Sequence, residues 1–169
     1  MIIKNHNIWI EPSAVAQEFQ KQLIATPVQT FLLCPVLVIA FEAAWRGGNL
    51  VIVPWGAILL VWGYAQYRFV GGYRHPRAGG GWGVDVPPDS IVDTGPYRYT
   101  RNPMYLGHLI FMLGLAVTFW SWFALLLFAA RAVWFHSRVL WDEARLEKEF
   151  GAEYANYKAR VKRWIPYVV

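Results

Sequence analysis

Cysteine is almost absent from this chain, since Cys34 is the only one among 169 residues. A single cysteine excludes an internal disulfide framework and a metal cluster held by cysteines. Charged residues make up only 16% of the chain, whereas 56% of residues are hydrophobic and the mean hydropathy is +0.27. This composition is too apolar for an ordinary soluble domain, and the length allows one compact domain. The sequence therefore indicates a membrane protein.

A cleavable leader and a nucleic-acid-binding surface are also not indicated. Residues 1–24 have no continuous apolar core and no small-residue cleavage site, so we expect no cleaved signal peptide. The net charge is +5, and the basic residues lie between and after the apolar segments. Such a distribution is typical of membrane proteins that keep basic segments on the cytoplasmic side. We therefore expect a lipid bilayer as partner, and no nucleic acid.

Four stretches of the chain are apolar enough to cross a bilayer, which takes about 20 residues each. They cover approximately residues 27–45, 50–69, 104–120 and 122–140. Tryptophans lie near the ends of these stretches, as in the aromatic belt at a membrane surface: Trp45, Trp55, Trp120 and Trp122. The sequence predicts an all-α integral membrane protein with about four transmembrane helices.

Basic residues are concentrated in alternate connections. The link between the first two spans carries only Arg46, and the turn between the last two carries no charge. The N-terminal segment, the loop 71–103 and the C-terminal segment are all basic. Because basic segments stay on the cytoplasmic side, we predict that both termini and the loop 71–103 are cytoplasmic.

The chain is expected to form a single membrane domain with four parts. Residues 1–26 include an amphipathic stretch, 11–24, that predicts a helix lying at the membrane interface. Residues 27–70 form a first helical hairpin, 71–103 a cytoplasmic loop, and 104–169 a second hairpin with C-terminal helices. Residues 71–95 are rich in glycine and proline but lack the preceding strand and the following Lys-Ser/Thr of a phosphate-binding loop. We interpret this stretch as a flexible connector.

The last apolar stretch continues beyond the membrane. Good helix formers follow it without a breaker as far as Phe150, so one long helix should enter the cytoplasm. Gly151 suits the position directly after a helix end. Residues 152–161 then predict a second, shorter helix.

An unusual loop precedes the third span, with the sequence Gly-Pro-Tyr-Arg-Tyr-Thr-Arg-Asn-Pro-Met-Tyr-Leu-Gly over residues 95–107. Asn102 suits a helix cap and Pro103 the first helical turn. A helix N-terminus attracts anions, and Arg98 and Arg101 strengthen that positive field. The alternative is that both arginines only anchor the chain at the membrane surface. The interleaved tyrosines favour a binding site for a polar, charged small molecule.

The long helix carries charges at helical spacing. Arg131, Arg138, Asp142 and Arg145 fall close to one line along it. A ladder of surface ion pairs outside the membrane is one interpretation of the last three. It does not explain Arg131, which lies deeper and requires an aqueous cavity or an anionic partner.

Two histidines offer an alternative of another class. His108 and His136 lie at similar depths on adjacent spans, where they would be able to hold a haem between them. No further haem signal accompanies them, and a hydrogen-bonded polar histidine is the default interpretation. This alternative describes a non-catalytic or haem-binding membrane subunit.

Two ordered motifs carry a family resemblance over about residues 92–166. The first is the segment 95–107, followed by a two-span hairpin. The second runs from Asp142 to Tyr157 and continues with Arg160-Val161 and Ile165-Pro166. Together they resemble the superfamily of isoprenylcysteine carboxyl methyltransferases and phospholipid methyltransferases. The same fold resembles part of the membrane sterol reductases, but four spans are fewer than those reductases have.

The resemblance implies methyl transfer from S-adenosylmethionine to a lipophilic acceptor: a prenylcysteine-like carboxylate, a thiol or a lipid amine. Arg101 would orient the acceptor if it carries a carboxylate, and Glu143 would act as a base or an electrostatic partner if the acceptor is an amine. The implied cofactor-binding residues are Tyr97, Arg98, Asn102, Pro103, Tyr105, Leu106, Gly107, His108, Arg138, Asp142, Glu143, Tyr154 and Tyr157. Asn102 stands where the family has histidine, and Asp142 where it has glutamate. No metal is expected, and the sequence leaves the oligomeric state open.

Overall fold

The computed structural model describes residues 25–79 and 89–165, and every regular element in these two ranges is helical. The all-α prediction is therefore confirmed for the described residues. The predicted interfacial helix at 11–24 lies outside them. The elements are α2 (Thr26–Val28), the π-helix η1 (Gln29–Leu33), α3 (Cys34–Trp45), α4 (Gly56–Ala78), the 3₁₀ turn η2 (Gly95–Arg98), α5 (Pro103–Thr118), α6 (Trp122–Phe150) and α7 (Ala152–Arg160).

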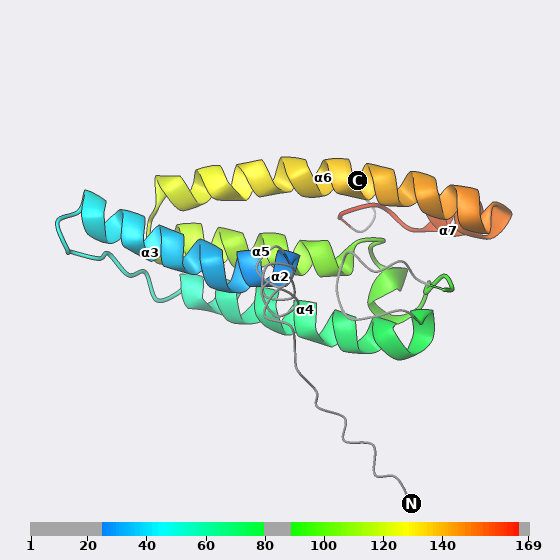
Figure 1. Cartoon of the computed structure of the whole chain (residues 1–169). Helices are drawn as coiled ribbons and strands as arrows, with labels where there is room; N and C mark the ends of the chain where they lie inside the picture. The colour runs from blue at the N-terminus through cyan, green and yellow to red at the C-terminus, as the bar shows by residue number, and fades with distance from the viewer. Residues whose placement is uncertain (1–24, 80–88, 166–169) are drawn as a thin grey trace, which may run out of the picture.

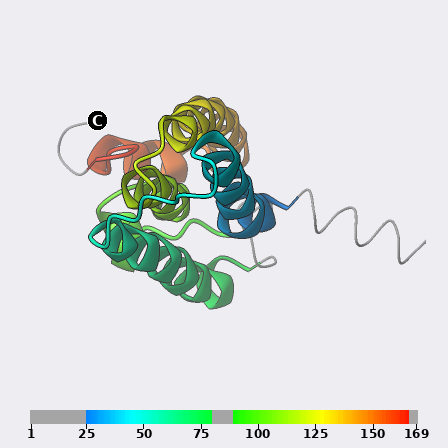
Figure 2. The same cartoon turned by 90° about the vertical axis from the view of Figure 1, so that its left-hand side faces the viewer.

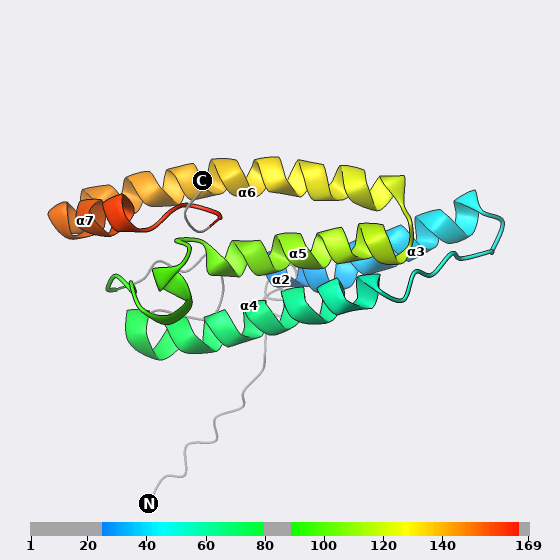
Figure 3. The same cartoon turned by 180° about the vertical axis from the view of Figure 1, so that it is seen from behind.

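The long helices lie side by side as a bundle, and α6 extends beyond the others at one end (Figure 1). The segments α2, η1 and α3 follow one another without a break and form a single helix. At the extended end of α6 the chain turns back as α7, beside η2 and the start of α5 (Figure 3). The end-on view shows α5 between α4 and α6 (Figure 2). The motifs before α5 and after α6 therefore meet at the same end of the bundle.

Glycines bring α4 and α5 into close backbone contact. Gly63 on α4 lies against Gly107 on α5, and further contacts are made by Gly56 with Thr118 and by Gly114 with Leu60. A Cβ atom at Gly63 would lie 2.4 Å from the backbone nitrogen of Phe111. Small residues at such an interface allow two helices to approach closely, which is common in membrane bundles.

Two boundaries differ from the prediction. The second predicted span, 50–69, begins as a helix only at Gly56, and this helix continues to Ala78 through Pro76. Residues 71–78 are thus helical and not part of a loop. The glycines at 71 and 72 suggested a break, but the packing of Val70, Gly71 and Ala78 in the interior outweighs their weak helix propensity. Gly79, with φ of +68°, ends the helix.

The long helix α6 follows the prediction closely. The Ser121 hydroxyl accepts a hydrogen bond from the Ala124 backbone N–H at 3.0 Å and so caps its start. Gly151 ends the helix with φ of +52°, a conformation that favours glycine. The next helix, α7, begins at once with Ala152. Both the 29-residue helix and its glycine stop are confirmed.

Two of the described helices are long and apolar enough to cross a membrane, Thr26–Trp45 and Trp122–Phe150. The third apolar helix, α5, is shorter, with 16 residues. Large apolar side chains point outward along the bundle, with Val61 exposed by 70%, Phe69 by 65% and Val133 by 69%. An apolar exterior of this kind is what a lipid-facing surface requires. The four-span topology itself stays a prediction.

Candidate functional site

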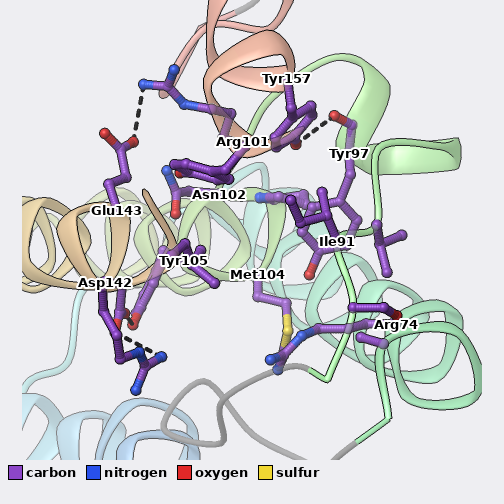
Figure 4. A pocket seen from close by; sticks show the side chains of 17 residues that line it. Arg74, Ile91, Tyr97, Arg101, Asn102, Met104, Tyr105, Asp142, Glu143 and Tyr157 are labelled. Carbon is purple, nitrogen blue, oxygen red and sulfur yellow. Dashed lines mark hydrogen bonds and ion pairs between the residues drawn. The ribbon is translucent and has the colours of Figure 1, made fainter. Parts of the chain in front are cut away.

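A pocket opens at the end of the bundle where the two sequence motifs meet (Figure 4). It is formed by the end of α4, the segment 90–92, the start of α5, the C-terminal part of α6, and α7. Including its open mouth, it holds about 770 Å³ of empty space. The predicted site residues that line it are Tyr97, Arg101, Asn102, Pro103, Tyr105, Asp142, Glu143, Tyr154 and Tyr157.

Arg101 and Glu143 form a buried ion pair at the centre of this pocket. The Arg101 Nη2 atom lies 3.0 Å from Glu143 Oε1, and the two side chains are only 8% and 7% exposed. Arg163 holds the same carboxylate with two further bonds, Nε to Oε1 at 3.0 Å and Nη2 to Oε2 at 2.9 Å. Because this bidentate bond favours the charged guanidinium, it raises the pKa of Arg163 above its usual value. Both oxygens of Glu143 are therefore engaged by arginines.

The segment before α5 is tied to the C-terminal segment by backbone bonds. The Arg101 backbone N–H donates to the Lys162 carbonyl at 3.0 Å, and the Thr100 hydroxyl donates to the Arg163 carbonyl at 2.9 Å. The Asn102 side chain also donates to that carbonyl, at 3.2 Å. Asn102 occupies the N-cap position of α5, as predicted, but its side chain bonds the Arg163 carbonyl and makes no cap hydrogen bond.

Asp142 gathers donors from two helices. It accepts a hydrogen bond from the Tyr105 hydroxyl at 3.0 Å, and it pairs with Arg138 and Arg145 at 3.4 Å each. The Arg138 and Arg145 guanidinium groups both lie over the Trp141 ring, at 5.3 and 5.2 Å from its centroid. The predicted ion-pair ladder is thus present, and its Asp142 and Arg145 also line the pocket.

Tyrosines close the pocket on the side of α7. Tyr154 and Tyr157 are buried against α6 and the segment 91–97, and the Tyr157 hydroxyl donates to the Tyr97 carbonyl at 2.8 Å (Figure 4). Burial raises the pKa of all three hydroxyls, to about 12 for Tyr97, where the nearby Arg74 opposes part of the shift. The carboxylate of Glu143 adds to the rise for Tyr154. These hydroxyls are therefore protonated at neutral pH, and the proton of Tyr157 is already donated to the Tyr97 carbonyl.

The remaining predicted site residues do not line the pocket. Arg98 is exposed on η2, and Leu106 is half-buried on α5. Gly107 lies against Gly63 and Tyr67 of α4, so its position is explained by helix packing. His108 is completely buried deeper in the bundle. Arg138 pairs with Asp142, which does line the pocket.

The two histidines do not form a matched pair. His108 has no exposed surface, whereas His136 is exposed and accepts a hydrogen bond from Trp164 Nε1 at 3.3 Å. Within the described ranges, no group of three or more metal-binding side chains is found. This arrangement gives no support to haem ligation by His108 and His136.

Arg131 has a partner other than the one predicted. Its guanidinium donates to the side-chain oxygen of Gln29 on η1, a neutral amide, and it lies 5.4 Å from the Trp134 ring. In the part of the chain that the structure describes, it is paired with no carboxylate. The expected anionic partner is thus not found among these residues.

Several pocket residues escaped the sequence analysis. Arg74 enters the pocket from the end of α4, which the sequence assigned to a loop. Ile91 and Met104 add apolar surface, and Arg163 completes the Glu143 cluster. Helical periodicity was the one feature of the sequence that could have identified Arg74. If the helix is continued past Gly71 and Gly72, Arg74 lies one turn after Val70, on the buried face of α4.

The chemistry of the pocket suits a ligand with both signs of charge and an aromatic ring. Arg101 and Arg145 each have a buried Nε atom without a hydrogen-bond partner among the described residues. Asp142 supplies a carboxylate, while Met104, Ile91 and the tyrosines supply apolar and aromatic walls. A zwitterionic nucleoside such as S-adenosylmethionine carries a carboxylate, an ammonium, a sulfonium and an adenine. The residues present therefore fit that cofactor class.

Comparison with curated proteins finds relatives of one kind. The chain is 34% identical over 80 residues to the Protein-S-isoprenylcysteine O-methyltransferase of Schizosaccharomyces pombe and to the Protein-S-isoprenylcysteine O-methyltransferase B of Arabidopsis thaliana. It is 32% identical over 80 residues to the corresponding protein of Saccharomyces cerevisiae. Each match covers 46% of this chain, but only 34%, 40% and 33% of these relatives.

A family-wide comparison extends further along the chain. The sequence model of the phospholipid methyltransferase family matches residues 50–153, from the segment before α4 to the start of α7. This range is more than half of the chain, and it contains both halves of the pocket, Arg101 before α5 and Glu143 on α6. The resemblance inferred from the two motifs is thereby confirmed. The chain belongs to the phospholipid methyltransferase family, within the superfamily that also holds the isoprenylcysteine methyltransferases.

Proposed function

We propose that this chain is an integral membrane methyltransferase that uses S-adenosylmethionine and acts on a lipophilic acceptor. The observation that carries the proposal is the pocket at one end of an apolar helix bundle, lined by arginines, two carboxylates and tyrosines. Membership of the phospholipid methyltransferase family supports it. The acceptor is a prenylcysteine-like carboxylate, a thiol or a lipid amine, classes suggested by the family and by the relatives' names.

The charged residues of the pocket divide into ligand contacts and supports. Asp142 is the carboxylate that would take the ligand ammonium, and Arg145 would take its carboxylate. Met104, Tyr154 and Tyr157 offer the apolar and aromatic surface that an adenine needs. When bound, S-adenosylmethionine supplies the methyl group from a sulfonium centre.

Glu143 acts in this proposal as a positioning residue. Since Arg101 and Arg163 occupy both of its oxygens, it is not available to take a proton from an acceptor unless one of these bonds opens. Its role is to hold Arg101 at the pocket wall, beside the segment 100–102. Methyl transfer is an in-line displacement, which depends mainly on alignment of the reacting groups and exclusion of water.

The membrane placement completes the proposal. The pocket lies at the basic end of the bundle, which we assign to the cytoplasm, and both termini belong on that side. The acceptor reaches the pocket from the bilayer, between helices whose outer surfaces are apolar. The haem-binding alternative is not proposed, because no observation favours it.

Transfer of labelled methyl groups tests the function directly. Purified protein in detergent is incubated with S-adenosylmethionine carrying a labelled methyl group and with a total lipid extract, and mass spectrometry identifies the product. We expect a labelled lipophilic product and binding of S-adenosylhomocysteine in calorimetry. Folded protein that neither binds S-adenosylhomocysteine at millimolar concentration nor labels any lipid would contradict the proposal.

A further inference from the structure

The C-terminal segment 161–165 runs back from α7 along α6 to the start of α5 (Figure 3). Its Lys162 carbonyl accepts a hydrogen bond from the Arg101 backbone N–H at 3.0 Å. Its Arg163 carbonyl accepts two more, from the side chains of Thr100 at 2.9 Å and Asn102 at 3.2 Å. These three bonds fix the position of the residues that lead into α5 and the pocket.

The Arg163 side chain orients the carboxylate at the centre of the pocket. Its guanidinium makes two bonds to Glu143, and Glu143 Oε1 is shared between Arg163 Nε and Arg101 Nη2, each at 3.0 Å. Glu143 and Arg101 line the pocket, whereas Arg163 does not. Any effect of Arg163 on a bound ligand must therefore pass through Glu143 and Arg101.

The next residue, Trp164, attaches this segment to α6. Its ring packs against the cluster of Tyr105, Phe135 and Val139. Its indole Nε1 donates a hydrogen bond to Nδ1 of His136 at 3.3 Å, and the two ring centroids lie 6.4 Å apart. Trp164 also does not line the pocket. Because it directly follows Arg163 in the chain, this attachment restricts where the neighbouring guanidinium lies.

The bond between Trp164 and His136 exists in only one protonation state of the imidazole. An indole N–H is a donor only, so the Nδ1 atom of His136 has to be unprotonated and accept the bond. When the imidazole takes up a second proton, both ring nitrogens become donors and the bond is lost. His136 is exposed, and imidazoles change charge between about pH 5 and 8. The attachment of Trp164 therefore depends on pH.

The charged and titratable side chains on the elements around His136 are engaged elsewhere. In the described part of the chain, the polar partner of His136 is Trp164. The other groups on α5, α6 and the C-terminal segment have partners of their own or face outward: Arg163 binds Glu143, Arg138 and Tyr105 bind Asp142, Arg131 binds Gln29, and Lys162 is exposed. Protonation of His136 therefore acts first on its bond with Trp164.

We propose that the C-terminal segment 161–165 positions the pocket for methyl transfer. Arg163 orients Glu143 and Arg101, and the hydrogen bond from Trp164 to neutral His136 holds Arg163 in place. The inference rests on the proposed function, to which it adds a positioning residue and a dependence on protons. While the imidazole is neutral, the segment is fixed; as the pH falls and His136 takes up a proton, the bond is lost, Arg101 is less well aligned, and methyl transfer slows.

Substitution of Arg163 tests the positioning role. In the full-length protein in detergent, Arg163→Met should lower the rate of methyl transfer from saturating S-adenosylmethionine into a lipid extract by about 10-fold or more, because misplaced groups align poorly. Affinity for S-adenosylhomocysteine should stay within a few-fold, since Arg163 does not line the pocket. Arg163→Lys should restore only part of the rate, and it serves as the test variant if Arg163→Met does not fold. The control Arg160→Met removes an exposed pair with Asp93 and should change neither quantity. Normal rates in folded Arg163→Met, or in Arg163→Lys if only that variant folds, would overturn the role.

The pH dependence of the rate tests the bond to His136. Trp164→Phe keeps an aromatic ring but removes the donor, so it should be slower than the wild type by about 3-fold or more near pH 8. This ratio should approach one near pH 5, because the protonated wild type has lost the bond as well. Trp62→Phe is the matched control, since it removes an indole hydrogen bond to Gln66 on the outer face of α4. Its ratio to the wild type should not vary with pH. A ratio for Trp164→Phe that stays constant with pH would overturn the proton dependence.

Nuclear magnetic resonance separates this inference from the proposed function, because it requires no methyl transfer. The indole N–H signal of Trp164 in isotope-labelled protein is assigned by its loss in Trp164→Phe. It should shift as the pH falls through the range in which imidazoles titrate, and this shift should be absent in His136→Phe. A signal that is the same at all these pH values would overturn the bond. The expected shift in a protein that binds no S-adenosylhomocysteine and transfers no methyl group would support the bond and count against the proposed function.

Discussion

Arg101, which precedes α5, and Glu143, on α6, form an ion pair at 3.0 Å that is shielded from solvent. The sequence separates them by 42 positions, and the antiparallel packing of α5 and α6 brings them together. The pair joins the two motifs of the family, and Arg163 closes it from the C-terminal segment. Removing one partner of such a buried ion pair lowers the stability of the protein more than replacing both partners does, because a single buried charge is left uncompensated.

Our first prediction concerns this pair. Arg101→Ala should lower the rate of methyl transfer by roughly 100-fold, because the Glu143 carboxylate and the segment 100–102 lose their shared contact. Arg101→Lys should restore only part of the rate, since an ammonium lacks the planar fork of the guanidinium. Affinity for S-adenosylhomocysteine should stay within a few-fold in both variants. Radiolabelled methyl transfer and calorimetry measure the two quantities.

A double-mutant cycle shows whether the pair acts as a unit. Arg101→Met combined with Glu143→Gln should give a coupling free energy of about 1–3 kcal/mol in detergent unfolding. Lys158→Ala is the control, because it removes a surface pair with Glu147 and keeps the backbone carbonyl that Arg101 uses. Near-normal methyl transfer in folded Arg101→Ala and Glu143→Gln would refute this account of the pair.

A second prediction concerns the ligand ammonium. Asp142→Asn should weaken S-adenosylhomocysteine binding by about 10-fold or more, because a charge-assisted contact is lost. Tyr105→Phe should have a smaller effect in the same direction, since it removes one donor that orients Asp142. Asp93→Asn changes an exposed carboxylate that pairs with Arg160 and serves as control. Unchanged affinity in Asp142→Asn would rule out this contact.

The glycine interface gives a third prediction, on stability. Gly63→Ala places a Cβ atom 2.4 Å from the Phe111 backbone nitrogen, so α4 and α5 have to separate. We expect a loss of about 1–3 kcal/mol or more in unfolding free energy. Gly72→Ala, on the exposed side of the same helix, should be neutral or stabilising. Thermal unfolding in detergent compares them, and equal melting temperatures would argue against close packing here.

The buried hydroxyl of Tyr97 predicts a pH dependence. Its pKa is raised to about 12 in the folded protein, from an ordinary value of 10. Below pH 10 the hydroxyl is protonated in both states, so its stabilising effect is complete. Between pH 10 and 12 only the unfolded chain loses the proton, and the unfolding free energy should fall by about 2–3 kcal/mol.

Comparison with Tyr97→Phe isolates this effect. The variant has no ionisable group at position 97, so its stability should fall less steeply between pH 10 and 12 than that of the wild type. Tyr154 is present in both proteins and cancels in the difference, whereas the pKa of Tyr157 is also raised by the Tyr97 charge, so the difference reports Tyr97 together with this coupling. Identical pH profiles in denaturant unfolding would show that Tyr97 ionises normally.

The fifth prediction is topological. Ser90→Cys, in a background with Cys34→Ser, should react with a membrane-impermeant thiol reagent only in inside-out vesicles. Asn49→Cys, in the short link after α3, should react only in right-side-out vesicles. The one-sided distribution of basic residues is the reason. Labelling of Ser90→Cys from outside would invert the assigned orientation.

The sequence by itself determined the helical class, the family and the length of α6. Continuous apolar runs and helix formers without breakers define these features locally, and the two motifs are contiguous in the chain. The glycine stop at Gly151 was predictable for the same reason, because it depends on the backbone freedom of one residue.

Tertiary structure decided how the site residues are used. Arg101 and Glu143 were both identified from the motifs, but their pairing depends on how α5 packs against α6. Arg163 and Arg74 escaped notice because they come from segments far away in the chain. The N-cap position of Asn102 was predictable, but the hydrogen bond from its side chain to a carbonyl 61 residues later was not. Such contacts depend on which segments of the chain meet at one end of the bundle. Local helix propensity does not determine how these segments are arranged.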